Sequence, residues 1–162
     1  WLWFLRDFSK IRKQNRNSMN KWKFSFFPIL YDKFDDSGVA RGQYFYQDVY
    51  VARKIYDKNP LNHLDIASRI DGFVAHVSIF RVIDVMDIRP LSTKIKNINF
   101  IQLDLMKSIP NNYIQKYHSL SCLHAIEHFG LGRYGDEIEI DGHIRALENI
   151  KNFLIKDGIF YF

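Results

Sequence analysis

The side chains best suited to chemistry are concentrated in one segment of this chain, residues 117–136, which reads YHSLSCLHAIEHFGLGRYGD. The segment holds three of the six histidines, three of the eight glycines and the single cysteine of the 162-residue sequence. Ionisable side chains beside flexible backbone are typical of binding and catalytic loops, and a hydrophobic core does not need so many of them. The segment is therefore the first candidate for a functional site.

Five residues of this segment are candidates for acid–base catalysis or substrate binding. A histidine, His124 or His128, titrates near neutral pH and can accept a proton from a hydroxyl nucleophile. Glu127 can orient that histidine. Arg133 can bind a phosphate or carboxylate through two parallel hydrogen bonds, and Tyr134 can stack or donate a hydrogen bond. The alternative is a loop in which these polar groups satisfy one another.

Two motif matches in the same segment point to other chemistry. The run GLGRYG at 130–135 fits G-x-G-x-x-G, but it neither follows a predicted strand directly nor opens a clear helix, so dinucleotide binding there is disfavoured. The run HAIEH at 124–128 fits H-x-x-E-H, which on a helix could hold zinc between two histidines. His124 falls at the end of a predicted strand, and glycines soon follow His128. We therefore expect no metal site, and a metal-dependent hydrolase is the weakest alternative.

Three aspartates, Asp65, Asp87 and Asp104, fall at the ends of predicted strands. Asp87 follows Asp65 by 22 residues, and an acid about 20 residues beyond the first turn suits the ribose hydroxyls of a nucleotide. The alternative is that each aspartate merely caps the next helix or turn. Their ordered recurrence favours a nucleotide-type cofactor.

The elements that must position these residues alternate between strands and helices after residue 60. Strands are predicted at 63–66, 82–86, 98–103, 119–123 and 159–162, and helices at 2–16, 44–56, 72–79 and 142–155. The last helix carries an apolar stripe of Ile144, Leu147, Ile150 and Leu154. Such alternation predicts an α/β fold, a mainly parallel sheet with helices on both faces, whose ligand lies beyond the carboxyl ends of the strands.

Three local features refine this prediction. Ala67 and Ser68 stand where a nucleotide-binding turn usually has glycine, and positive φ is costly for alanine, so either the first turn takes a modified path or the site is less open than usual. Cys122 lies within the fourth predicted strand and is expected to be a core residue and not a nucleophile. The pair Asp157-Gly158 predicts a turn before the fifth strand.

The charge is concentrated at the N-terminus. The net charge is +5, but the first 24 residues carry seven basic side chains against one acidic, so the remainder sums to −1. We therefore predict a basic, aromatic helical arm at 1–40 and an α/β domain at 41–162. Such an arm can lie on an anionic membrane surface or contact a protein partner. The alternative is a helix packed on the domain with a solvated basic face. We expect no nucleic-acid partner.

The composition also bounds the compartment. No run of about 18 apolar residues occurs, so no transmembrane helix is expected. A single cysteine excludes an internal disulfide and fits a reducing compartment. We expect a cytoplasmic protein that could associate peripherally with the inner face of the membrane through its arm.

The ordered strand ends resemble those of class I S-adenosylmethionine-dependent methyltransferases. The order is a strand and the Asp65 turn, a strand and Asp87, then Asp104, then a strand followed by Glu127 and His128. The run LIKDG at 154–158 resembles the turn before the fifth strand of that superfamily. Longer blocks resemble a family known as domain of unknown function 268 over roughly residues 38–162. These blocks are 42–48 with 51–53, 63–77 with 87–90, and 119–136.

The resemblance implies a Rossmann-like methyltransferase fold that binds S-adenosylmethionine, with Asp87 on the ribose hydroxyls and Asp104 and Leu105 flanking the adenine. The cofactor-binding residues that it implies are Asp65, Ala67, Ser68, Arg69, Asp87, Ile88, Asp104 and Leu105. The superfamily fold continues to a sixth and a seventh strand, so we expect this domain to be incomplete at its C-terminus.

The resemblance also implies a substrate, because the family occurs among bacterial surface-polysaccharide genes. The expected reaction is methyl transfer to a hydroxyl of a sugar or surface-polysaccharide precursor, with His124 or His128 as the base. The glycine-poor first turn and the absent last strands support an alternative, a catalytically inactive methyltransferase-like domain for binding or assembly.

Overall fold

The structure is a computed structural model that describes residues 1–38 and 40–162. The chain divides into two compact units, Trp1–Ala40 and Arg41–Phe162. Val39, which belongs to the predicted arm, lies outside the described residues. None of the helices in the described part of the chain is long and apolar enough to cross a membrane.

The first unit is built around helix α1, Leu2–Asn17, which confirms the helix predicted at 2–16. No residue of α1 is buried. The chain that follows, with the short helical turn η1 at Asp32–Phe34, places aromatic rings against the helix. The Phe8 and Phe26 ring centroids are 5.5 Å apart, and those of Trp3 and Phe34 are 5.9 Å apart. Ring contacts at the surface of α1, and not a buried core, therefore hold this unit together.

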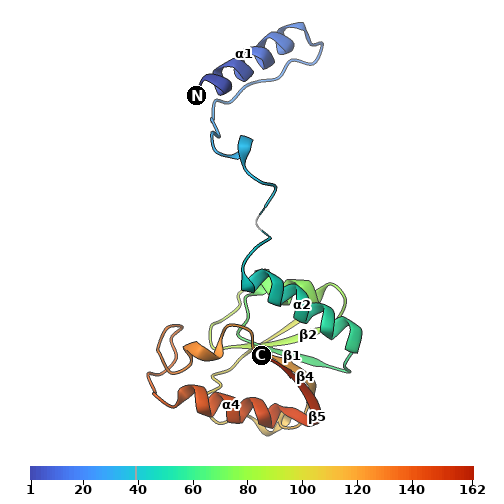
Figure 1. Ribbon diagram of the computed structural model, residues 1–162, viewed down its shortest axis with the longest axis vertical. Coiled ribbons are helices and arrows are strands. Elements are labelled where there is room, and N and C mark those ends of the chain that lie inside the picture. Colours follow the sequence, from blue (N-terminus) through green and yellow to red (C-terminus); the bar gives the residue numbers. More distant parts are fainter. Residues whose placement is uncertain (39) are drawn as a thin grey trace. The chain divides into compact units, whose positions relative to one another are not determined.

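The second unit is an α/β fold, as the alternating pattern predicted. Among its described residues, five strands form one all-parallel sheet in the order β3-β2-β1-β4-β5 (Figure 1). The strands are β1 His63–Ile66, β2 Ile83–Asp87, β3 Ile98–Gln102, β4 Tyr117–Ser121 and β5 Leu154–Tyr161. The chain runs outward from β1 to β3 and then returns to the other side of β1. The strand order therefore reverses between β1 and β4, the place where open α/β sheets bind ligands.

Helices cover both faces of this sheet, and α2 and α4 lie on opposite sides of it (Figure 1). Alternate residues of β2 serve the two faces, with Ile83 and Val85 in one core cluster and Met86 in the other. Helix α2, Gln43–Lys58, buries Ile55 in the first cluster. Helix α4, Gly142–Phe153, buries Phe153 in the second. Each large apolar side chain removed from water contributes roughly 1.5–3 kcal/mol, so the sheet is fixed from both sides.

The predicted stripe of helix 142–155 is wrong in part. Ile150 is buried, but Ile144 and Leu147 remain 47% and 39% exposed, and the buried partners of Ile150 are Ala146 and Phe153. The helix face with Ala146, Ile150 and Phe153 therefore packs on the sheet, and Ile144 and Leu147 lie on the exposed side. The small Ala146 side chain lets the helix approach the sheet closely.

The helix predicted at 72–79 is also interrupted. A single turn, η2 at Ile70–Val74, is followed by the short helix α3 at Ala75–Ser78. Gly72 within that turn has non-helical angles, φ −114° and ψ −117°. A Cβ at Gly72 would lie 3.0 Å from Oδ2 of Asp48, so the kink lets an α2 carboxylate approach the backbone after β1.

Two predicted strands have different boundaries in the structure. β4 ends at Ser121, so Cys122 lies just beyond the strand, where it is buried as predicted and burial raises the pKa of its thiol. The predicted turn at Asp157-Gly158 lies inside β5. Tyr117 pairs with Leu154 while Ser119 pairs with Ile159, and Asp157 has φ +62°. The turn residues are thus absorbed as a bulge, which leaves the strand continuous.

Candidate functional site

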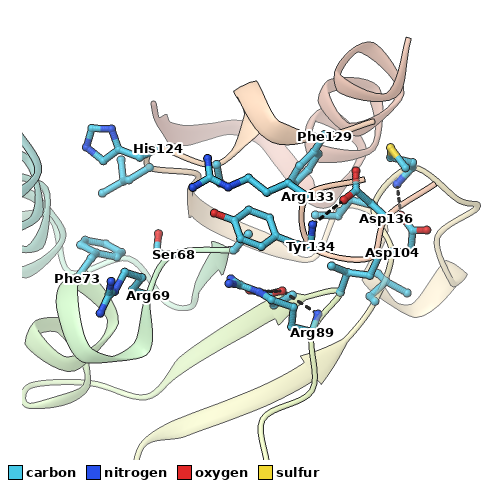
Figure 2. A pocket seen from close by; sticks show the side chains of 18 of the residues that line it. Ser68, Arg69, Phe73, Arg89, Asp104, His124, Phe129, Arg133, Tyr134 and Asp136 are labelled. Carbon is cyan, nitrogen blue, oxygen red and sulfur yellow. Dashed lines mark hydrogen bonds and ion pairs between the residues drawn. The ribbon is translucent and has the colours of Figure 1, made fainter. Parts of the chain in front are cut away.

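A cavity of about 440 Å³ opens at the carboxyl ends of the strands. Ser68 reaches it from the turn after β1, Asp104 from beyond β3 and His124 from beyond β4 (Figure 2). Asp87 lines it from the end of β2, and Tyr44 from α2. These positions surround the point where the strand order reverses. The volume lies within the roughly 300–1,000 Å³ typical of small-molecule sites.

Most of the site residues predicted from the sequence meet at this cavity. Those that line it are Ala67, Ser68, Arg69, Asp87, Ile88, Asp104, Leu105, His124, Arg133 and Tyr134. Asp65 is fully buried beneath the first turn. Glu127 and His128, in the helical turn η4 at Ile126–His128, are not among the lining residues.

The carboxylate of Asp65 organises the first turn from below. It accepts hydrogen bonds from the Ser68 amide at 3.1 Å, the Ser68 hydroxyl at 2.9 Å and the Ser121 hydroxyl at 2.6 Å. Burial raises its pKa to about 6, although these hydrogen bonds oppose the shift. Ala67 adopts φ +59° and donates its amide to the Met86 carbonyl at 2.9 Å. Of the two alternatives, the modified path is therefore wrong, because the alanine takes the left-handed conformation at a cost of roughly 1–2 kcal/mol.

A buried histidine extends this network into the core. His63 Nε2 lies 3.0 Å from the Ser121 hydroxyl oxygen, and Nδ1 contacts Ser119. Because Ser121 gives its proton to Asp65, we assign the His63 proton to Nε2, which then donates to Ser121. Burial, and then the charge of Arg81, lower the pKa of His63 to about 3. The sequence contained no signal for this role beyond the position of His63 in β1.

The Asp87 carboxylate is paired with Arg89, a residue that the sequence analysis did not select. Arg89 Nε and Nη2 lie 3.0 and 2.5 Å from the two carboxylate oxygens, and the Arg89 amide donates to the first of them at 2.8 Å. The Tyr134 ring lies between two guanidinium groups, with its centroid 4.3 Å from Arg89 Cζ and 5.2 Å from Arg133 Cζ (Figure 2). Oδ1 accepts two of these hydrogen bonds and Oδ2 one, so Oδ2 can still accept a ligand hydroxyl.

The glycine-rich match at 130–135 binds a carboxylate of its own loop. Asp136 accepts amide hydrogen bonds from Gly130 at 2.9 Å, Gly132 at 3.1 Å and Tyr134 at 3.1 Å. Burial alone would raise the pKa of Asp136, but these backbone donors lower it below its usual value. The amides that could cradle a phosphate are therefore already satisfied, and the loop is pinned in one conformation.

The opposite end of the cavity holds an imidazole without a hydrogen-bond partner. His124 has φ +56°, and its ring centroid is 3.9 Å from that of Tyr44. Within the described part of the chain, its buried Nε2 has no partner. Asp48 lines the same cavity; burial raises the pKa of this carboxyl, and attraction to His124 opposes that rise. An imidazole that lines a cavity beside a carboxylate is suited to acid–base work.

The H-x-x-E-H match does not converge on one point. His124 lines the cavity, whereas His128 contacts Arg133 outside the lining. In the ranges 1–38 and 40–162, no three His, Cys, Asp or Glu side chains are grouped as metal ligands.

Other lining residues escaped the sequence analysis. Tyr44 and Asp48 belong to the block 42–48 that carried the resemblance, which is the signal that could have placed them. The same signal could have placed Arg89, because it belongs to the resembling block 87–90. Phe129 and Asp136 belong to the segment 117–136.

The chain was compared with protein families, curated proteins and solved structures. No curated protein and no solved structure matches it. A family described as "Caenorhabditis protein of unknown function, DUF268" matches residues 72–162, which is more than half of the chain. The matched region contains Asp87, Asp104, His124 and the whole loop 130–136. The chain therefore belongs to the DUF268 family of proteins of unknown function.

Proposed function

We propose that the unit 41–162 binds S-adenosylmethionine and methylates a hydroxyl of a sugar or surface-polysaccharide precursor. The observation that carries the proposal is the cavity at the reversal of strand order, walled by the turn after β1, by Asp87 and by Asp104. A nucleoside cofactor needs acceptors for its ribose hydroxyls and an apolar wall for its base. Asp87 supplies the first, and Leu105 and Met106 supply the second.

The residues of the chain would act on the acceptor substrate mainly by holding it in position. When bound, S-adenosylmethionine supplies an electrophilic methyl group. His124 would accept the proton of the acceptor hydroxyl on its imidazole, which lines the cavity. Tyr44 packs on the imidazole and fixes its orientation. Correct orientation of reacting groups alone can supply several kcal/mol of the barrier.

Cofactor binding is expected to depend on Asp87. Calorimetric titration with S-adenosylhomocysteine should give saturable binding to the wild type and binding about 10- to 100-fold weaker to Asp87→Ala, since hydrogen bonds to a charged group contribute roughly 1.5–3 kcal/mol. Asp57→Ala, an exposed aspartate of α2 outside the cavity, should bind like the wild type. Absence of binding by the wild type would exclude the proposal.

A second candidate is a methyltransferase-like module that binds a ligand without transferring a methyl group. It is favoured by the Arg89–Asp87 pair, because a ribose would have to share both carboxylate oxygens with the guanidinium. Incubation with S-adenosylmethionine labelled in its methyl group separates the two candidates. A labelled sugar product excludes the inactive module, whereas saturable cofactor binding without any labelled product favours it.

We also propose that the first unit binds anionic membrane surfaces. Leu2 and Leu5 of α1 are 86% and 54% exposed, and the same helix carries five basic residues. An exposed apolar edge beside basic side chains is what an interfacial helix uses on anionic lipid.

Sedimentation with vesicles tests this surface. Binding to vesicles that contain phosphatidylserine is expected, and Lys10→Gln with Lys13→Gln should weaken it about 30-fold, because each basic residue near the surface contributes about 1 kcal/mol. Lys94→Gln with Lys96→Gln removes two exposed lysines of the second unit and should leave binding unchanged. Equal loss in both double variants would contradict a role for the arm.

A further inference from the structure

We infer that the acceptor carries an anionic group, a phosphate or a carboxylate, and that Arg133 binds this group inside the cavity. The inference rests on the proposed function for the identity of the acceptor. It is carried by the charges that face the cavity and by the way Arg133 is held.

Among the described residues that line the cavity, Arg133 is the arginine without a carboxylate partner. Arg69 pairs with Asp71 through two hydrogen bonds, of 2.9 and 2.6 Å, and Arg89 pairs in the same way with Asp87. In the part of the chain that the structure describes, Arg133 forms no ion pair with a carboxylate. Its Nη1 instead lies 3.1 Å from Nε2 of His128. Its charge is therefore available to a ligand.

The Arg133 side chain is also held in place before any ligand arrives. It projects from the loop that Asp136 pins through three amides. Its guanidinium lies over the Tyr134 ring and against His128. A planar guanidinium in a fixed orientation matches the two oxygens of a phosphate or carboxylate and loses little freedom on binding them.

The location of the guanidinium connects the anion to the proposed reaction. Arg133 and His124 line the same cavity, and the Arg133 guanidinium extends toward the side where His124 lies (Figure 2). An acceptor anchored by its anionic group at Arg133 would direct a nearby hydroxyl toward the imidazole of His124. A sugar phosphate, a nucleotide sugar or a sugar acid offers this chemistry, whereas a neutral sugar does not.

Calorimetry on the full chain saturated with S-adenosylhomocysteine tests the inference with two probes, inorganic pyrophosphate and glucuronate. Saturable binding of pyrophosphate identifies a phosphate as the anion, and saturable binding of glucuronate identifies a carboxylate. Arg133→Gln should weaken the bound probe at least tenfold. Arg53→Gln, an exposed arginine of α2 outside the cavity, should change it less than twofold.

The outcomes separate the inference from the proposed function. Failure of both probes to bind, or equal binding to Arg133→Gln and the wild type, overturns the anion site. A loss of S-adenosylhomocysteine affinity in Arg133→Gln with unchanged thermal unfolding also overturns it, because Arg133 would then serve the cofactor. Pyrophosphate binding that depends on Arg133 in a protein that binds no S-adenosylhomocysteine keeps the anion site and removes the proposed function.

Discussion

Replacing Gly130 with alanine is expected to destabilise the second unit by about 2–5 kcal/mol, since strain at positive φ costs roughly 1–2 kcal/mol and overpacking roughly 1–3 kcal/mol. Gly130 has φ +82°, and a Cβ there would lie 2.0 Å from the carbonyl oxygen of Glu139. That oxygen belongs to backbone, which cannot move aside as a flexible side chain can. The free energy of unfolding, measured by urea denaturation, checks the expected loss.

Gly135 in the same loop is the matched control. It has φ +88°, and a Cβ there would meet no other atom within 4 Å, so Gly135→Ala should cost only the backbone strain of roughly 1–2 kcal/mol. The difference between the two variants isolates the contact at Gly130. Equal losses in both would mean that the close approach to Glu139 is not what requires glycine.

The contact at Gly130 also determines how the loop 130–136 packs against helix α4. A Cβ at Gly142, in the first turn of α4, would lie 2.7 Å from the Gly130 Cα. Two glycines thus let the loop that carries Arg133 and Tyr134 pack directly on a helix of the core. The glycines of the segment 117–136 therefore serve close packing as well as the amide contacts to Asp136.

The parts of the fold that depend on local pattern could be predicted from the sequence. Short apolar runs that alternate with helices specify a parallel sheet, and the carboxyl ends of parallel strands meet at one edge. That is why Asp87 and Asp104, which are distant in sequence, reach one cavity. Their common position follows from topology alone.

Two contacts could not be predicted, one across a long sequence separation and one within the loop 130–136. Asp48 lines the cavity from α2 and lies against Gly72, where a Cβ would be 3.0 Å from its Oδ2, and no local pattern encodes that approach. The glycine-rich loop matched a phosphate motif, since amides that bind phosphate and amides that bind an internal carboxylate need the same backbone. Only the position of Asp136 in space distinguishes the two.

The buried residues His63 and Asp65 are expected to change stability in opposite directions between about pH 4 and pH 6. The folded pKa of Asp65, about 6, lies above its usual 3.8, so the folded state holds the extra proton and stability rises as the pH falls through 6. The folded pKa of His63, about 3, lies below its usual 6.5, so the unfolded state holds the extra proton and stability falls with the pH. Each slope approaches about 1.4 kcal/mol per pH unit, and in the wild type the two largely cancel.

Single variants should reveal the two opposing slopes. Between pH 6 and pH 4, His63→Gln should gain about 2 kcal/mol of unfolding free energy relative to the wild type, and Asp65→Asn should lose about 2 kcal/mol. The double variant should run parallel to the wild type, because the other titrating groups are common to all four proteins. Ser121 joins the two residues, so burial in one network imposes a neutral histidine and a carboxyl that resists ionisation. If the unfolding free energies of all four proteins changed with pH in parallel, the network would impose neither a neutral His63 nor a raised pKa of Asp65.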